Sequence, residues 1–290
     1  MNDSSRNRAI PFWKMSGSGN DFVVIDNRDG ILPQELASSF TRAVCRHRVS
    51  VGADGVVLIA DSVEPGVHFE WRYINADGSD GEMCGNGAMC GARFAMLNGI
   101  APAECVFRTE SGLVHAWVDS DPACPNVRIA VADPSTLRSG VELIAAGREL
   151  SLHAITVGVP HAVAIVPDVD AFAPGDELVP IGRSVRHHDV FSPAGTNLNV
   201  IAVRDRHTIR MRTYERGVEA ETLACGTGAI ASAIATTSLE LTEPPVTVIT
   251  SGGRPLRVDF TWQNGRAAAV TLGGDARVIV RGEIDPEALD

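Results

Sequence analysis

Two copies of the pattern Cys-Gly-x-Gly-Ala carry the chemistry that this sequence offers. The first is Cys84-Gly85-Asn86-Gly87-Ala88 and the second is Cys225-Gly226-Thr227-Gly228-Ala229. Each follows a strand-like run and precedes a helix-like run. Glycines allow a ligand to approach the backbone closely, and the unpaired N–H groups that begin a helix bind a carboxylate. The same position lowers the pKa of a thiol towards neutrality. Each copy therefore predicts an anion cradle beside a thiol that can act as a base.

We interpret Cys84 and Cys225 as a pair that faces one small-molecule site. One thiolate removes the α-proton of an amino acid and the opposite thiol supplies a proton to the other face, which inverts the centre without a cofactor. A single copy would be weak support, since cysteine is often a small buried side chain. The other four cysteines lack a second copy and are interpreted as packing: Cys45, Cys90, Cys105 and Cys124. No Cys-x-x-Cys pair exists, and no metal site is expected.

The two copies belong to a longer repeat. The offset from Cys84 to Cys225 is 141 residues, and the same offset relates Asn20 to His161. It also relates Tyr73 to Tyr214, the two tyrosines of the chain. His47 and His188 are related in the same way and are interpreted as structural. An offset without gaps predicts two successive copies of one unit.

The pattern of apolar residues predicts the elements that hold the motifs. Residues 34–47 predict a helix with Leu36, Phe40 and Val44 on its apolar face. Residues 88–97 and 229–239 contain almost no charge, and a helix without a polar face is buried. Strands are predicted on both sides of each motif, at 21–26, 56–59, 67–74, three within 104–132, 162–166, 198–203, 246–250, 255–262, 267–272 and 276–282.

These elements predict an α/β (α+β) protein of two pseudo-symmetric domains. Each domain is expected to be a mostly antiparallel, barrel-like sheet wrapped round a central helix. The predicted boundaries are residues 1–132, to which 273–290 return, and residues 133–272.

Composition narrows the class of protein. The chain has 290 residues and a formal net charge of −11, which argues against binding to nucleic acid. No apolar run reaches the length of a membrane span or a signal peptide, so we expect a cytoplasmic protein that binds a small molecule and no membrane. Lys14 is the only lysine and lies in no phosphate-binding context, which disfavours pyridoxal phosphate. No cofactor is expected, and a homodimer is among the expected assemblies.

Six stretches together resemble the diaminopimelate epimerase family, in the order in which that family has them. They are Lys14-Met15-x-Gly-x-Gly-Asn20-Asp21-Phe22, Asn75-Ala76-Asp77-Gly78-Ser79, Cys84-Gly85-Asn86-Gly87, Pro160-His161-Ala162-Val163, Tyr214-Glu215-Arg216-Gly217 and Glu221-Thr222-Leu223-Ala224-Cys225-Gly226-Thr227-Gly228.

The resemblance implies a cofactor-independent isomerase that interconverts LL- and meso-diaminopimelate in lysine biosynthesis, with Cys84 and Cys225 as the acid/base pair. It implies that His161 and Glu215 lie near the thiols and tune them. The residues implied to bind the substrate are Asn20, Asn75, Gly85, Asn86, Asn197, Glu215, Arg216, Gly226 and Thr227.

The sequence departs from the family where the far end of the substrate would be bound. Val159 replaces a common asparagine, Gly55 a glutamine of some members, and Ser16 a frequent histidine; the loop at 218–220 is one residue longer. Two alternatives therefore stay open. One is a related two-thiol racemase of histidine or a proline derivative, and the other is a thiol redox protein.

Overall fold

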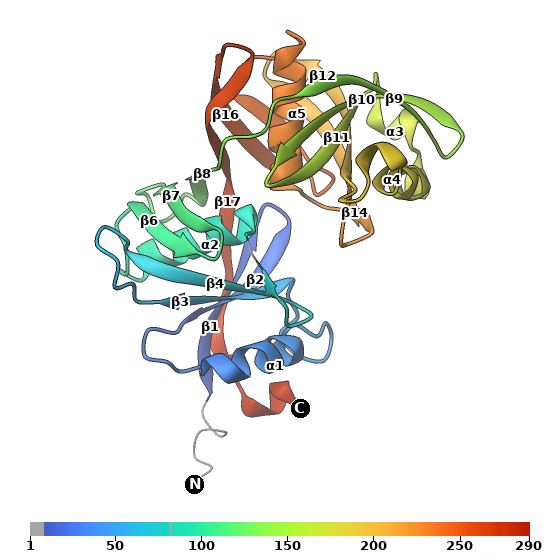
Figure 1. Ribbon diagram of the computed structural model, residues 1–290. Helices are drawn as coiled ribbons and strands as arrows, with labels where there is room; N and C mark the ends of the chain where they lie inside the picture. The colour runs from blue at the N-terminus through green and yellow to red at the C-terminus, as the bar shows by residue number, and fades with distance from the viewer. Residues whose placement is uncertain (1–8, 82) are drawn as a thin grey trace. The chain divides into compact units, whose positions relative to one another are not determined.

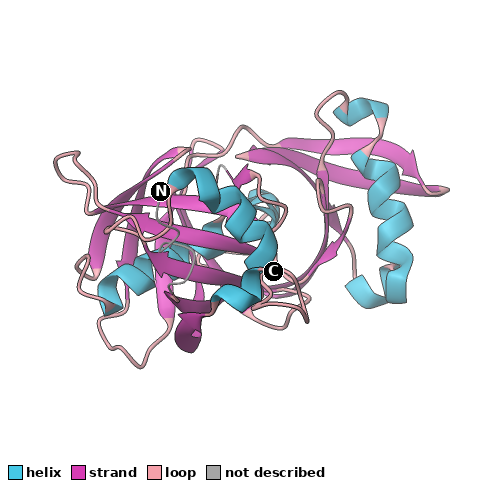
Figure 2. Cartoon of the chain, turned by 90° about the horizontal axis from the view of Figure 1, so that it is seen from below, coloured by secondary structure: helices cyan, strands magenta, loops and turns pink. Residues whose placement is uncertain are grey.

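The chain folds into two units in a computed structural model, which describes residues 9–81 and 83–290. One unit comprises Met1–Ile129 and Gly274–Asp290, and the other comprises Ala130–Gly273. Strands are the main secondary structure of each unit (Figure 1, Figure 2). No helix within the described ranges is long and apolar enough to cross a membrane. The predicted α+β class is confirmed.

The first unit is a ring of strands round one helix. Its strands are β1 (Ile10–Gly17), β2 (Asn20–Asp26), β3 (Gly55–Ala60), β4 (Phe69–Asn75), β5 (Asp80–Gly81), β6 (Glu104–Thr109), β7 (Gly112–Val118), β8 (Asn126–Ala130) and the end of β17 (Arg266–Ile284). Pairing runs β1-β2-β3-β4-β6-β7-β8-β17 and returns to β1, which closes the ring. The pairs β2–β3 and β4–β6 are parallel. Its helices are α1 (Gln34–Val44), α2 (Gly85–Leu97) and η3 (Pro286–Leu289).

The second unit repeats this order. Its strands are β9 (Arg138–Ala145), β10 (Arg148–Val157), β11 (Val159–Ile165), β12 (Asn197–Asp205), β13 (Thr208–Glu215), β14 (Ala220–Thr222), β15 (Val246–Ile249), β16 (Pro255–Gln263) and the start of β17. The pairs β11–β12 and β13–β15 are parallel, as their counterparts are in the first unit. The helices are α3 (Val169–Phe172), η1 (Gly175–Glu177), α4 (Leu178–Arg186), η2 (Asp189–Phe191) and α5 (Gly226–Ser238).

The central helices are buried, as predicted. Residues 86–95 of α2 and 228–236 of α5 are buried against the strands around them. Arg93, the one charge on α2, is 5% exposed and donates to the carbonyl oxygens of Ala276 and Pro122, each at 2.7 Å. These two bonds offset part of the cost of burying the charge, while the Arg93 Nε has no partner among the described residues.

Two local predictions are wrong. Leu36 lies on the outer side of α1 and is 52% exposed, because Ala37, Phe40, Thr41 and Val44 form the buried face. The separate strands predicted at 267–272 and 276–282 are one strand, β17. This strand pairs with β16 as far as Gly273 and with β1 from Ala276 onwards.

The repeat holds in topology but not as one ungapped offset. Phe22 lies opposite Gly55 on β3, whereas Val163, 141 residues after Phe22, lies opposite Asn199 on β12. The offset on this second strand of the pair is therefore 144. Gly55 pairs with Asn75 and Asn199 pairs with Thr213, so the offset on the next strand falls to 138.

The two tyrosines are consequently not counterparts. Tyr73 lies on the α2 face of its sheet, where it stacks on Trp71 with the ring centroids 5.7 Å apart. Tyr214 lies on the opposite face, in the core under α4, where a Cβ on Gly182 would meet its ring at 2.3 Å. The register makes Met211 the counterpart of Tyr73. The matching sequence offset of the tyrosines is a coincidence.

Candidate active site

Cys84 is the N-terminal cap of α2. Its backbone is extended, with φ −137° and ψ 111°, and its carbonyl oxygen accepts from the Ala88 N–H at 2.8 Å, so the helix begins directly after the thiol. Cys84 is partly buried. The first N–H groups of any α-helix lack acceptors within the helix. Those of Gly85, Asn86 and Gly87 are thus placed as the predicted anion cradle requires.

Asn86 and Asn20 form a hydrogen-bonded chain beside this cap. The Asn20 Nδ2 donates to the Asp54 carboxylate at 2.9 Å, which directs the Asn20 Oδ1 towards the Asn86 Nδ2 at 2.8 Å. Asn86 is 3% exposed, and its Oδ1 has no hydrogen-bond partner among the described residues. The structure therefore brings these two predicted residues together and leaves one buried acceptor.

Asn75 forms hydrogen bonds within the turn that it begins. Its side chain donates to the Ser79 Oγ at 3.0 Å, and its backbone N–H donates to the Ser79 carbonyl oxygen at 2.9 Å. The role of Asn75 in binding a substrate stays a prediction.

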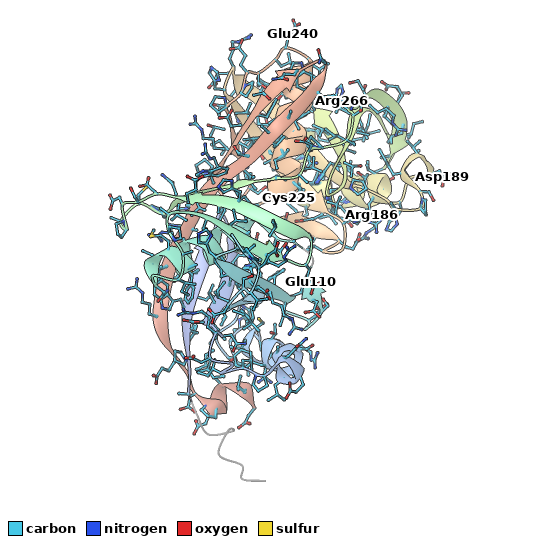
Figure 3. The ribbon with its side chains drawn as sticks, turned by 60° about the vertical axis from the view of Figure 1, so that its left-hand side comes forward. Glu110, Arg186, Asp189, Cys225, Glu240 and Arg266 are labelled. Atoms are coloured by element: carbon cyan, nitrogen blue, oxygen red, sulfur yellow. The ribbon has the colours of Figure 1, made fainter. Side chains whose placement is uncertain are left out.

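Cys225 occupies the same position on α5 (Figure 3). It has φ −132° and ψ 109°, within a few degrees of Cys84. Its Sγ lies 3.6 Å from the Glu215 Oε1 and 3.6 Å from the Thr227 Oγ1. The two motifs therefore share their local backbone geometry.

The pKa of Cys225 contradicts one prediction. Burial, and then the charge of Glu215, raise the pKa of this thiol far above its ordinary range; the Thr227 hydroxyl and the Gly228 N–H oppose them in part. The sequence predicted a lowered pKa. Burial also raises the pKa of Glu215. Cys225 therefore rests as a thiol, with a carboxylate within reach of its proton.

His161 lies on β11 and is 1% exposed. Its Nδ1 lies 3.1 Å from the Asn199 Nδ2 and 3.5 Å from the Asn197 Nδ2. Burial, and then the charge of Arg216, lower the pKa of His161 to about 3, so the ring is neutral at physiological pH. The structure thus joins two predicted residues, His161 and Asn197, to a third that the sequence did not indicate.

The turn after β13 carries Glu215 and Arg216. The Arg216 N–H donates to the Asn197 Oδ1 at 2.6 Å, and its guanidinium donates to the Ala194 carbonyl oxygen at 3.0 Å. Both side chains are partly buried.

Comparison with known proteins identifies the family. The sequence profile of "Diaminopimelate epimerase" matches residues 12–133 and 153–279. The chain is 40% identical to a diaminopimelate epimerase of Aquifex aeolicus, over 97% of this chain and 100% of that protein. It is 38% identical to one of Archaeoglobus fulgidus, over 93% and 94%.

The chain belongs to the diaminopimelate epimerase family. This is a family of isomerases, and the predicted resemblance is confirmed.

Solved structures share the fold at low sequence identity. A hydroxyproline epimerase of Agrobacterium vitis, solved with bound trans-4-hydroxy-L-proline, gives a TM-score of 0.70 at 15% identity, over 98% of this chain and 93% of that one. A phenazine biosynthesis protein of Bacillus anthracis gives 0.70 at 12% identity, over 96% and 99%. These likenesses concern the fold alone.

Two departures from the diaminopimelate epimerase family have structural explanations. Gly55 has no room for a side chain, because a Cβ there would lie 2.5 Å from the ring of Tyr73. The longer loop at 218–220 is held by Glu219, whose carboxylate accepts from the Tyr214 hydroxyl at 2.9 Å and from Arg186 on α4 at 3.3 Å. Val159 is partly buried at the start of β11, and nothing in the structure explains its replacement of asparagine.

The remaining cysteines differ among themselves. Cys45, Cys90 and Cys105 are buried, as predicted. The interpretation of Cys124 as a packing residue is wrong, since this cysteine is partly exposed and its Sγ accepts from the Asn126 side chain at 3.1 Å. His188 caps η2 by accepting the Val190 N–H at 3.2 Å, in agreement with its structural interpretation.

A cavity of about 430 Å³ lies in the first unit, away from these residues. Arg72 and Arg108 in its wall are paired with the carboxylates of Asp80 and Glu64. None of the predicted site residues lines it.

Proposed function

We propose that this protein interconverts LL- and meso-diaminopimelate by proton transfer between two cysteines. The observation that carries the proposal is the pair of helix caps: Cys84 and Cys225 have nearly the same backbone angles, and each begins a buried helix. The family membership supports this substrate.

The chemistry follows from two thiols on opposite faces of one α-carbon. A thiolate takes the α-proton, and the electron pair of the broken C–H bond delocalises into the carboxylate, which the helix N–H groups stabilise. The other thiol then gives its proton to the opposite face, where the new C–H bond forms. The two sulfurs exchange protonation states in each turnover.

Glu215 suits the thiol of Cys225 because its Oε1 accepts a hydrogen bond from the Cys225 Sγ at 3.6 Å. When Cys225 acts as the base, Glu215 is placed to accept the proton that the thiol must first lose. Cys225 as a resting thiol is equally suited to donate its proton.

We propose that the substrate is held from both units. The N–H groups that begin α2 and α5, at Gly85, Asn86, Gly226 and Thr227, would hold the reacting carboxylate. Arg216 would hold a distal carboxylate. The ammonium groups of the substrate, and the carboxylate oxygens that accept from an amide, would be bound by Asn20, Asn75, Asn197 and Glu215. The buried free Oδ1 of Asn86 supports a contact with an ammonium group.

The environment of Lys14 supports a mechanism without pyridoxal phosphate. Its ammonium lies 2.6 Å from the Asp21 carboxylate and also donates to the Gly52 carbonyl oxygen. A Schiff base needs a deprotonated, accessible amine. The only lysine of the chain is instead engaged by Asp21 and by the Gly52 carbonyl oxygen.

We also propose that the two domains are residues 1–132 with 273–290, and residues 133–272. We further propose a cytoplasmic location and a homodimeric assembly.

Substrate selectivity tests the proposal directly. The reduced protein is incubated separately with LL-diaminopimelate, L-proline, trans-4-hydroxy-L-proline and L-histidine, and the stereoisomers are separated by chiral chromatography. We expect conversion of diaminopimelate alone. Turnover of a proline derivative or histidine without turnover of diaminopimelate would replace the proposed substrate with that of a related racemase.

A further inference from the structure

Two asparagine side chains converge on one nitrogen of His161. The Asn199 Nδ2 lies 3.1 Å from the His161 Nδ1, and the Asn197 Nδ2 lies 3.5 Å from the same atom. All three residues are buried, with exposures of 1% for His161, 2% for Asn197 and 0% for Asn199. Asn197 and Asn199 are two residues apart on β12, so both project from the same face of the sheet.

The backbone fixes the orientation of both amides. The Asn199 Nδ2 faces the Ala162 carbonyl oxygen at 3.4 Å, and a carbonyl oxygen can only accept. The Asn197 Oδ1 accepts the Arg216 backbone N–H at 2.6 Å, and an N–H can only donate. The Thr213 hydroxyl donates to the Asn199 Oδ1 at 3.0 Å, which also fixes the orientation of the Asn199 amide. Both NH₂ groups are therefore turned towards the imidazole.

An NH₂ group has no lone pair to offer, so the His161 Nδ1 must be the acceptor and cannot carry a proton. The proton of the neutral ring then resides on Nε2. The His161 Nε2 has no hydrogen-bond partner within residues 9–81 and 83–290. A buried N–H donor without a partner is costly unless a ligand accepts from it.

We propose that Asn199 is a positioning residue that, together with Asn197, fixes His161 as its Nε2–H tautomer, so that the ring offers a neutral hydrogen-bond donor to the ligand. This inference rests on the proposed function for the identity of the ligand, an amino acid whose carboxylate can accept from Nε2–H.

The arrangement determines what His161 does. Its Nδ1 lone pair is occupied by Asn199, and its lowered pKa keeps the ring neutral at physiological pH. The ring therefore enters the reaction as a donor and not as the base that removes a proton. Gly228 contributes to this geometry, because a Cβ there would lie 2.3 Å from the Asn199 Oδ1.

Nitrogen NMR tests the tautomer without a substrate. The full chain is labelled with ¹⁵N-histidine, and the His161 signals are those lost in His161→Gln. We expect an unprotonated Nδ1 and a protonated Nε2 in the wild type. In Asn199→Asp the carboxylate can only accept, so Nδ1 should become protonated. Asn264→Asp makes the same change at an exposed turn and should leave the His161 signals in place.

An Nδ1–H tautomer in the wild type, or an unchanged tautomer in folded Asn199→Asp, would overturn the proposal. The wild-type spectrum decides alone if Asn199→Asp fails to fold. The kcat of Asn199→Asp should also fall by about 100-fold, as expected for the loss of one positioned hydrogen-bond donor. A shifted tautomer with unchanged kcat would remove His161 from catalysis. The NMR result stands even if the protein does not act on diaminopimelate, so the two proposals fail separately.

Discussion

At the scale of single residues, burial outweighs the helix dipole at Cys225. A helix N-terminus stabilises an anion by about 0.3–1 kcal/mol, whereas full burial shifts a pKa by several units, each about 1.4 kcal/mol. The sequence showed the helix start but not the extent of burial, so it predicted the wrong direction. Cys225 is therefore a thiol at rest and needs a nearby carboxylate to accept its proton before it can act as the base. Glu215 lies in that position.

His161 should make the stability of the protein depend on pH. Its folded pKa of about 3 lies below the ordinary value of about 6.5, so only the unfolded chain takes up a proton between these values. The stability is fully present above pH 6.5 and is lost as the pH falls towards 3. We expect the free energy of unfolding to fall more steeply in the wild type than in His161→Gln, with a difference approaching about 1.4 kcal/mol per pH unit.

Urea unfolding between pH 7 and pH 4 measures this difference. The exposed His187 provides the control, and His187→Gln should follow the wild type. Parallel profiles for the wild type and His161→Gln would show that burial does not hold this ring neutral.

Asn199 shows where the sequence stops being informative about single residues. The family resemblance implied roles for His161 and Asn197 but not for Asn199. The available signal was its spacing of two residues from Asn197, next to a strand predicted from residue 198, since residues at this spacing in a strand share a face. Its contact with His161 depends on the pairing of β11 with β12, which the sequence did not specify.

At the scale of elements, the sequence predicted which helices and strands exist better than it predicted the register in which the strands pair. The nearly uncharged runs after both cysteines correctly indicated buried helices. The constant offset of 141 does not hold from β2 to β4, because the loops that connect these strands differ in length from the corresponding loops of the second unit. A shift by an odd number of residues turns a side chain to the other face, which separated Tyr73 from Tyr214.

The two motif glycines should respond differently to one substitution. A Cβ at Gly87 would make ordinary contacts of 3.4 Å with Phe22 and Trp71, whereas one at Gly228 would lie 2.3 Å from the Asn199 Oδ1. Gly87→Ala should leave stability unchanged or raise it by up to about 1 kcal/mol through helix propensity. Gly228→Ala should lower it by about 1–3 kcal/mol through overpacking.

Urea denaturation of both variants gives the comparison, and each serves as the control for the other. Equal effects of Gly87→Ala and Gly228→Ala would mean that the packing round α5 is looser than the structure indicates.

At the scale of the whole molecule, the chain is two copies of one topology. Each unit contains the same two parallel pairs and one buried helix that begins at a cysteine. The sequence predicted this because the motif, the buried-helix pattern and the order of strands all recur. It could not predict that β17 would be one continuous strand, since a turn-like Gly273-Gly274 separates its two apolar halves.

The central claim joins the two units of the molecule: the cysteine of one unit removes the α-proton, and the cysteine of the other donates a proton to the opposite face. The direct test incubates LL-diaminopimelate in deuterated water with the reduced wild type, Cys84→Ala and Cys225→Ala, and with Cys124→Ala as a control at a partly exposed cysteine. We expect the wild type and the control to form the meso isomer with deuterium at the inverted α-carbon. Either single variant at the helix caps should lose at least about 100-fold in turnover. Full turnover by Cys84→Ala or by Cys225→Ala would contradict the two-cysteine mechanism.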